Sequence, residues 1–264
     1  MLEAVFIRPM VFSFSWIRGI IKFTFFFLTV LEYILHHELV KLIIRDENNL
    51  YRYYLKSVRR HARFGLWLLN IKVEDHAQVE NINGLLISNH LSYLDVLVLF
   101  SKYPSLFITS REIRDVFLLG RMTKLAGCFH VERRKHLRTE LIVRQEMDSM
   151  KEKLISGFSL FLFPEGTSSD GSSVLPFKAH FFQTVIDLNM PVHAFCLKYH
   201  WKNSSDEVCW YGDMTFAPHL FNVCCQKQIS ADLQAIKYER GEESDRFKIA
   251  SDLHLRIKEM YEEH

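Results

Sequence analysis

The sequence has few of the features that would mark a disulfide-rich, zinc-binding or strongly charged protein. Its five cysteines are odd in number and include no C-x-x-C pair. This argues against a disulfide framework and a zinc ribbon, and it favours a reducing compartment. The formal net charge of +2 is too small to indicate a nucleic-acid partner. The chain also contains no internal repeat or low-complexity tract.

Two common catalytic loops are missing as well. No G-x-S-x-G segment occurs in the chain, so a serine hydrolase built on that turn is not expected. Gly166 and Gly171 have the spacing of a phosphate-binding loop, but Ser172 stands where such a loop requires a lysine. Nucleotide hydrolysis is therefore discounted.

The chain contains enough apolar residues for one sizeable domain, since 48% of its 264 residues are hydrophobic and 24% are charged. From Ile71 onwards, strand-like and helix-like segments alternate, which is typical of an α/β fold. We predict an α/β domain over residues 70–264 and a helical segment over residues 1–69. Residues 201–213 are polar enough for a surface excursion. Strands are expected near residues 71–74, 84–88, 105–109, 128–132, 159–163 and 191–199, and helices near residues 93–102, 113–125, 136–156, 177–188 and 244–262.

The N-terminal segment has the composition of a membrane-associating element. Residues 10–44 carry a phenylalanine-rich run, but Glu32 and the polar stretch from His36 to Glu38 interrupt it. The uninterrupted run is shorter than the ~20 apolar residues that a spanning helix needs. There is also no small-residue cleavage site of a signal peptide. We therefore expect an interfacial helix pair rather than a membrane span.

Residues 51–69 continue this theme, because basic residues recur there at helical spacing beside apolar ones. Such a pattern suits anionic lipid headgroups. A solvated helix face packed on the core would give the same pattern, and both interpretations stay open. The basic residues are Arg52, Lys56, Arg59, Arg60 and Arg63.

A histidine and a carboxylate follow one short apolar run. Residues 85–87 predict a buried strand that ends at a loop, so His90 lies just beyond its carboxyl end. Asp95 comes five residues later, and Ser92 with Asp95 fits a capping box that would fix the turn. A carboxylate on one ring nitrogen leaves the other free to accept a proton, which suits deprotonation of a hydroxyl. The alternative is a structural histidine with Asp95 serving only the helix start.

A second strand opens into a loop rich in glycine and hydroxyl groups. The apolar run from Phe158 stops at Pro164, and residues 165–171 follow with two glycines. Glycine lets the backbone approach a ligand closely, and exposed N–H groups can hold an anionic or carbonyl oxygen. A plain strand-to-helix turn would explain the glycines but not Glu165 beside them.

Taken together, four short motifs stand in order along the chain, and they resemble those of the glycerolipid acyltransferase family that includes bacterial 1-acylglycerol-3-phosphate acyltransferase. The resemblance covers roughly residues 70–200. In the second motif, Gly127 to Arg133, His130 and Glu132 replace the family's phenylalanine and aspartate. The motifs are Asn89-His90 with Asp95, Gly127 to Arg133, Phe163 to Thr167 (followed by Pro176-Phe177-Lys178), and Met190-Pro191-Val192.

This resemblance implies a fold and a reaction. The fold would be a mixed, largely parallel sheet flanked by helices. His90 would be the general base for a lysolipid hydroxyl and Asp95 its orienter. The donor would be a thioester of coenzyme A or acyl carrier protein, with no other cofactor and no metal. Oxyanion donors could come from residues 166–168 or from the turn at Ser110-Arg111. Headgroup binding is implied for Arg133, Glu165, Gly166 and Thr167, with Arg111, Ser168 and Lys178 as further substrate-binding candidates.

Departures from the family pattern keep the acceptor open. Arg111 stands where family members often carry lysine, and Ser168 replaces the arginine of many phosphatidate-forming members. An arginine fork is the side chain best suited to a phosphate. The expected acceptor is 1-acyl-sn-glycerol-3-phosphate; the alternatives are lyso-ornithine lipid, another lysolipid, or a non-catalytic membrane-interface protein. The expected location is the cytoplasmic face of a bacterial inner membrane, and the sequence indicates no oligomeric state.

Overall fold

A computed structural model describes residues 14–77, 79, 82–116, 119–132, 134, 139–200, 208–236, 238–239, 241 and 245–263. The strands are β1 Ile71–Asp75, β2 Leu85–Ser88, β3 Leu106–Ser110, β4 Phe129–Val131, β5 Leu160–Leu162, β6 Val192–His200 and β7 Ile229–Ile236. The helices are α1 Phe14–Ile43, α2 Glu47–Leu69, α3 Leu94–Lys102, α4 Arg111–Arg114, α5 Leu119–Leu125, α6 Glu140–Ile155, α7 Phe182–Asp187, α8 Phe216–Cys225 and α9 Arg246–Glu263.

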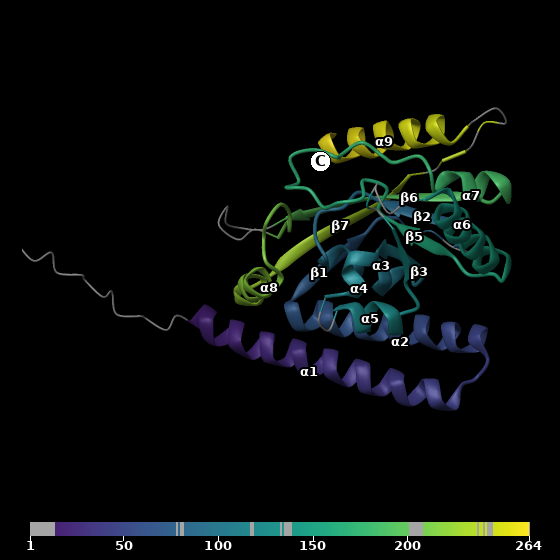
Figure 1. Cartoon of the computed structure of the whole chain (residues 1–264). Coiled ribbons are helices and arrows are strands. Elements are labelled where there is room, and N and C mark those ends of the chain that lie inside the picture. Colours follow the sequence, from purple (N-terminus) through teal and green to yellow (C-terminus); the bar gives the residue numbers. More distant parts are fainter. Residues whose placement is uncertain are drawn as a thin grey trace, which may run out of the picture.

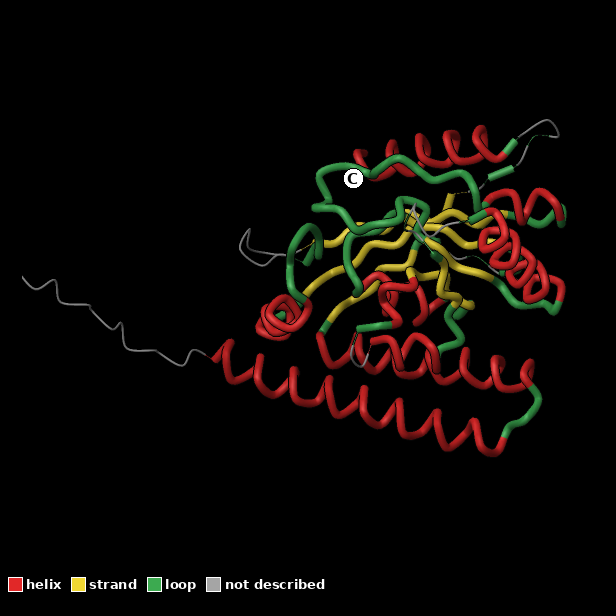
Figure 2. Tube along the Cα trace, in the orientation of Figure 1, coloured by secondary structure: helices red, strands yellow, loops and turns green. Residues whose placement is uncertain are grey.

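The strands form one sheet in the order β1-β7-β6-β2-β5-β3-β4. β6 and β7 pair antiparallel, whereas every other neighbouring pair is parallel. Helix α9 covers one face of the sheet, and α2, α3 and α5 lie on the other, with α1 outside α2 (Figures 1 and 2). The predicted α/β fold with a mixed, largely parallel sheet is thus confirmed.

The centre of the sheet explains why the first motif begins with a continuous apolar run. β2 lies between β5 and β6, and Leu85, Leu86 and Ile87 are all fully buried. A strand covered on both faces needs apolar side chains at every position rather than at alternate ones. Because β2 and β5 are parallel neighbours, the loops that follow them start at the same edge of the sheet. This places the first and third motifs side by side.

Several expected elements differ from the structure. The helix expected over residues 113–125 is two helices, α4 and α5. Strand β7 and helix α8 were not predicted, although Ile229, Ala231 and Leu233 alternate with polar residues as in a half-buried strand. Of the predicted surface excursion over residues 201–213, residues 201–207 lie outside the described residues, and the prediction is wrong at Val208 and Cys209, which are buried.

Within the segment expected to form an interfacial helix pair, residues 14–43 form one continuous helix, α1. This helix packs against α2. Glu32 and Glu38 do not break α1, because they face other helices: Glu32 bonds His61 of α2 at 2.7 Å and Glu38 pairs with Arg121 of α5 at 2.8 Å. Helix α1 is long and apolar enough, by length and composition, to cross a membrane. The interruptions therefore do not rule out a membrane span by α1, and the expected interfacial placement stays a prediction.

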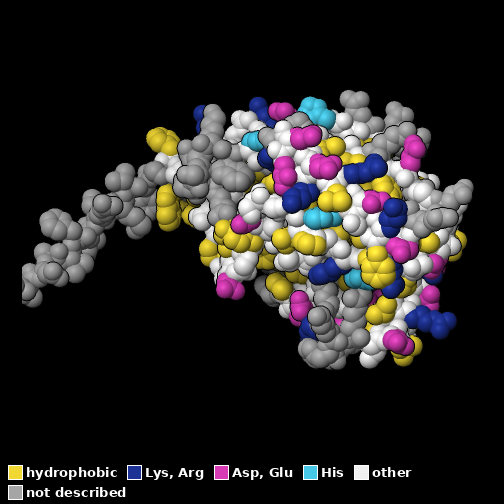
Figure 3. All heavy atoms as spheres, turned by 90° about the horizontal axis from the view of Figure 1, so that it is seen from above, with side chains coloured by type: hydrophobic (Ala, Val, Ile, Leu, Met, Phe, Trp, Pro, Cys, Tyr) yellow, Lys and Arg dark blue, Asp and Glu magenta, His cyan; other side chains and the backbone are white. Residues whose placement is uncertain are grey.

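The two sides of the molecule differ in character. Figure 3 looks onto the α9 side, where basic and acidic side chains are interspersed. The outer side of α1 instead exposes large apolar side chains, a concentration that marks a membrane or partner surface. These side chains include Phe14, Trp16, Ile17, Ile20, Ile21, Phe25, Leu28, Leu31, Leu35, Leu39, Leu42 and Ile43.

Some of the basic side chains of α2 contact other parts of the protein. Arg59 and Arg63 both donate to the backbone carbonyl of Ser101, in the last turn of α3. A cation there interacts favourably with the helix dipole. Arg52 lies over the Phe158 ring, 5.5 Å from its centroid. Part of the predicted headgroup-binding pattern therefore stabilises the packing of α2 instead.

One buried amide holds the β2–α3 loop to the sheet, and its removal should be costly. Asn89 donates to the Leu197 carbonyl and accepts from the Leu197 N–H, both at 2.8 Å. Asn89→Ala would leave two buried backbone groups unpaired, so we expect the free energy of unfolding to fall by roughly 2–4 kcal/mol. Chemical denaturation in detergent micelles measures this. The matched control is the exposed Asn83→Ala; equal stabilities of the two variants would contradict the prediction.

Candidate active site

His90 and Asp95 form a hydrogen-bonded pair in the loop between β2 and α3. His90 Nδ1 lies 2.8 Å from Asp95 Oδ2. Because the carboxylate can only accept, Nδ1 carries the ring proton and Nε2 is left as the basic nitrogen. The His90 ring stacks on Phe163, with centroids 3.8 Å apart and planes 4° from parallel. The imidazole is therefore fixed in both tautomer and orientation.

Asp95 is completely buried, and both of its carboxylate oxygens accept hydrogen bonds. Oδ2 also accepts the backbone N–H groups of Leu91 at 2.7 Å and Ser92 at 3.0 Å. Oδ1 accepts the hydroxyl of Tyr199, on β6, at 2.9 Å. A buried charge needs such partners to remain ionised. The site thus holds a carboxylate ready to stabilise a protonated His90.

The predicted capping box is only half present. Asp95 accepts the Ser92 N–H, as the motif requires. The Ser92 hydroxyl does not cap the helix: α3 begins at Leu94, after Tyr93, with no side-chain cap. The Ser92 oxygen is buried without a hydrogen-bond partner among the described residues. The carboxylate itself therefore fixes the turn.

Glu165 supports His90 from the neighbouring loop. Its Oε1 accepts the His90 N–H at 2.7 Å and its Oε2 accepts the Leu175 N–H at 2.9 Å. The side chain is buried, and this burial raises the pKa of Glu165 to about 7, although the two backbone donors oppose the shift. Ser169 N–H donates to the His90 carbonyl at 3.0 Å. Both backbone polar groups of His90 are thus held by the third motif.

The rest of the third motif is partly exposed. Gly166 has φ +78°, a backbone conformation that residues other than glycine rarely adopt, so the loop favours a glycine there. Lys178 is exposed, and its N–H donates to the Pro164 carbonyl at 2.9 Å. Thr167 is exposed beside it. The Ser168 hydroxyl donates to the Trp210 carbonyl, which occupies it within the protein.

The two arginine candidates, Arg111 and Arg133, are only partly placed. Arg111 begins α4, where its Nε donates to the His130 carbonyl at 3.4 Å and its guanidinium lies 3.8 Å from Glu146. Arg133 lies outside the described residues. Its neighbour Arg134 pairs with Glu132 at 2.7 Å. Among the described residues, no cluster of three or more His, Cys, Asp or Glu side chains could hold a metal ion.

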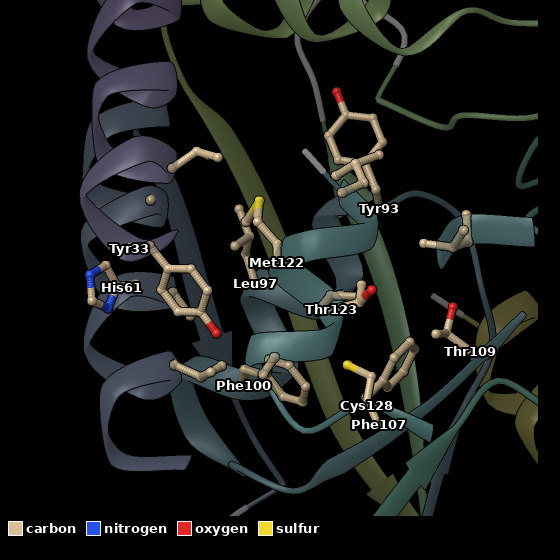
Figure 4. A pocket seen from close by; sticks show the side chains of 18 of the residues that line it. Tyr33, His61, Tyr93, Leu97, Phe100, Phe107, Thr109, Met122, Thr123 and Cys128 are labelled. Carbon is tan, nitrogen blue, oxygen red and sulfur yellow. The ribbon is translucent and has the colours of Figure 1, made fainter. Parts of the chain in front are cut away.

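An apolar cavity of about 270 Å³ lies between the helices (Figure 4), and His90 is among the residues that line it. Helices α1, α2, α3 and α5 line it together with β3, and Phe163, Trp210 and Phe216 contribute rings to its wall. The cavity, Tyr199 and Trp210 were not predicted. Each depends on residues that are distant in sequence, and the only sequence signal was the aromatic content of these segments.

Comparisons with known proteins show which family the chain resembles. The family model described as Acyltransferase matches residues 70–198. A Neisseria gonorrhoeae protein named 1-acyl-sn-glycerol-3-phosphate acyltransferase is 30% identical over 68% of this chain and 70% of its own length. A Rhizobium meliloti protein named lyso-ornithine lipid O-acyltransferase is 25% identical over 76% of this chain and 73% of its own.

Solved structures include a protein of similar fold. The 1-acyl-sn-glycerophosphate acyltransferase PlsC from Thermotoga maritima superposes with a TM-score of 0.63. The alignment covers 94% of this chain and 97% of that one, at 17% identity. This likeness shows the fold, and the family match together with the Neisseria relative shows that the chain belongs to the PlsC-like family of acyltransferases.

Proposed function

We propose that this enzyme transfers a fatty acyl group from an acyl-coenzyme A or acyl carrier protein thioester to the free hydroxyl of a lysophospholipid. The preferred acceptor is 1-acyl-sn-glycerol-3-phosphate and the product is phosphatidic acid. The observation that carries this proposal is the His90–Asp95 pair, in which His90 is one of the residues that line an apolar cavity. The relatives' names supply the substrate class.

In this mechanism, His90 moves one proton in each direction. Nε2 takes the proton of the acceptor hydroxyl while the oxygen attacks the thioester carbonyl, and Asp95 stabilises the imidazolium. When the tetrahedral intermediate collapses, the C–S bond breaks and the imidazolium returns the proton to the thiolate. The oxyanion needs preorganised donors. Gly166 N–H already donates to the Phe163 carbonyl, so the amides of Thr167 and Ser168 are the proposed donors.

The apolar cavity would hold the acyl chain. Its walls are mostly aliphatic and aromatic, and burying a hydrocarbon chain there contributes about 0.8 kcal/mol per methylene. The exposed apolar side of α1 would keep the protein at the membrane surface that supplies the lysolipid. We place the enzyme at the cytoplasmic face of the membrane, where thioester donors are made. No cofactor beyond the thioester is required.

The acceptor phosphate would be bound by cations from two motifs. Lys178 lies against Gly166, and Arg133 follows from the second motif. Ser168 replaces the family's frequent arginine, and its hydroxyl is engaged by the Trp210 carbonyl. This hydrogen bond favours a second candidate acceptor, lyso-ornithine lipid. The Rhizobium protein named for that acceptor matches 76% of this chain.

Removal of the base should abolish transfer. We expect His90→Ala to lower turnover by ~10²–10⁴-fold, the usual contribution of a general base. Asp95→Asn should lower turnover less, because a poorly oriented base remains. Product formation is followed by mass spectrometry with lysophosphatidate as acceptor, and circular dichroism checks the fold. Near-normal turnover of folded His90→Ala would disprove the mechanism.

The buried Glu165 should give stability a characteristic pH dependence. Its pKa is raised from 4.5 to about 7, so the folded state binds more protons than the unfolded state between these values. The free energy of unfolding should therefore decrease as pH rises through this window, by up to about 3 kcal/mol. The variant Glu165→Gln should lack this contribution, whereas the exposed Glu259→Gln should retain it. Parallel stability curves for wild type and Glu165→Gln would contradict the assignment.

Phosphate recognition should depend on arginine more than on serine. A hydrogen bond to a charged group contributes ~1.5–3 kcal/mol, against ~0.5–1.5 for a neutral one. We therefore expect Arg133→Ala to raise the apparent KM for lysophosphatidate more than Ser168→Ala does. Initial rates over a range of acceptor concentrations test this order. If the wild type ignores lysophosphatidate and acylates lyso-ornithine lipid, the second candidate replaces the first.

A further inference from the structure

One hydroxyl group stands out in the wall of the apolar cavity. Tyr33 of α1 lines the cavity, and its side chain is only 4% exposed. Its hydroxyl oxygen is fully buried and has no hydrogen-bond partner among the residues that the structure describes. A phenylalanine would fill the same space without this unsatisfied group. The hydroxyl is therefore a candidate for contact with whatever occupies the cavity.

The Tyr33 ring is held firmly, so its hydroxyl has a fixed position. The His37 ring packs against it with centroids 3.9 Å apart, and the His61 ring meets it edge-on at 5.0 Å. His61 is itself fixed by Glu32 at 2.7 Å and by the Ser57 carbonyl at 2.8 Å. A preorganised donor loses little entropy when a ligand binds.

Water is a poor partner for this hydroxyl. A buried water typically needs two to four polar partners, and apolar cavities stay dry. Of the neighbouring polar groups in the wall, Thr123 already donates to the Gly120 carbonyl at 3.1 Å and contacts His130 Nε2 at 2.9 Å. Cys128 offers only a weak thiol donor. The missing partner is therefore best supplied by the bound ligand.

The position of Tyr33 indicates which part of the ligand it meets. Figure 4 shows Tyr33 and Thr109 on opposite sides of the cavity. Thr109 lies near the carboxyl end of β3, beside β5, and Phe163 follows β5 and stacks on His90. An acyl chain whose carbonyl lies at His90 would thus reach Tyr33 with its distal part.

We propose that this cavity selects acyl chains that carry a hydroxyl or oxo group in their distal part, and that Tyr33 hydrogen bonds to that oxygen. The inference rests on the proposed function, in which the cavity holds the acyl chain. An unsubstituted chain would leave the Tyr33 hydroxyl unpaired, whereas a substituted chain would satisfy it. Sites with buried polar groups discriminate against ligands that lack the matching group.

The test compares matched donors on the full-length protein. A palmitoyl thioester competes with hydroxypalmitoyl thioesters whose hydroxyl occupies successive distal positions. We expect wild type to prefer one hydroxylated donor by about 2- to 12-fold, the ratio that one neutral hydrogen bond gives. Tyr33→Phe should remove or reverse this preference without lowering the melting temperature. Tyr54→Phe is the control, because Tyr54 is equally buried but lines a separate cavity whose wall includes several charged residues.

A binding measurement separates this inference from the proposed function. Palmitic acid and its hydroxylated forms displace a fluorescent fatty acid from the cavity, with no turnover required. If no donor is transferred but wild type still binds a hydroxylated acid more tightly and Tyr33→Phe does not, the proposed function fails and this inference stands. If wild type and Tyr33→Phe share the same donor and acid preferences, or Tyr33→Phe melts lower, the inference is overturned.

Discussion

The buried carboxylate of Asp95 is the constraint on which the active site depends. An ionised group removed from water must be fully hydrogen-bonded, and four donors from two parts of the chain, residues 90–92 and Tyr199, meet this need. They fix the turn after β2, the tautomer of His90 and the position of β6, which carries Tyr199. In the proposed mechanism, this turn, which resembles a helix cap, mainly supports His90 as the base.

The neighbouring loop completes this arrangement, since Glu165 is separated from His90 by 75 residues in sequence yet holds its backbone N–H. Parallel pairing of β2 and β5 brings the two loops to one edge of the sheet. Glu165 was predicted to bind the headgroup, but the structure places its carboxyl inside the protein. In the proposed mechanism it is a positioning residue, and Gly166 to Ser168 remain nearest to substrate.

The helical hairpin combines two tasks on opposite sides of one helix. The outer side of α1 exposes large apolar residues, whereas Val30, Tyr33 and Ile34 face the protein, and Val30 and Tyr33 line the cavity. The element suited to a lipid surface therefore also encloses the space proposed for the acyl chain. Arg18 and Lys22 tie α1 to backbone carbonyls of the core, which makes the hairpin part of the fold.

The sequence by itself determined the local features: the buried β2 run, His90 five residues before Asp95, and the glycine turn at Gly166. These depend on short-range sterics, burial and spacing, so the largely parallel α/β fold and the base–carboxylate pair were predictable. Strand β7 also carries a local signal, because buried apolar residues alternate with polar ones along it. Only the tertiary structure decided the partners of Asp95 and Glu165, the course of α1 and the cavity at Tyr33. These arise where distant segments pack together, and no local pattern specifies which buried donor meets which acceptor.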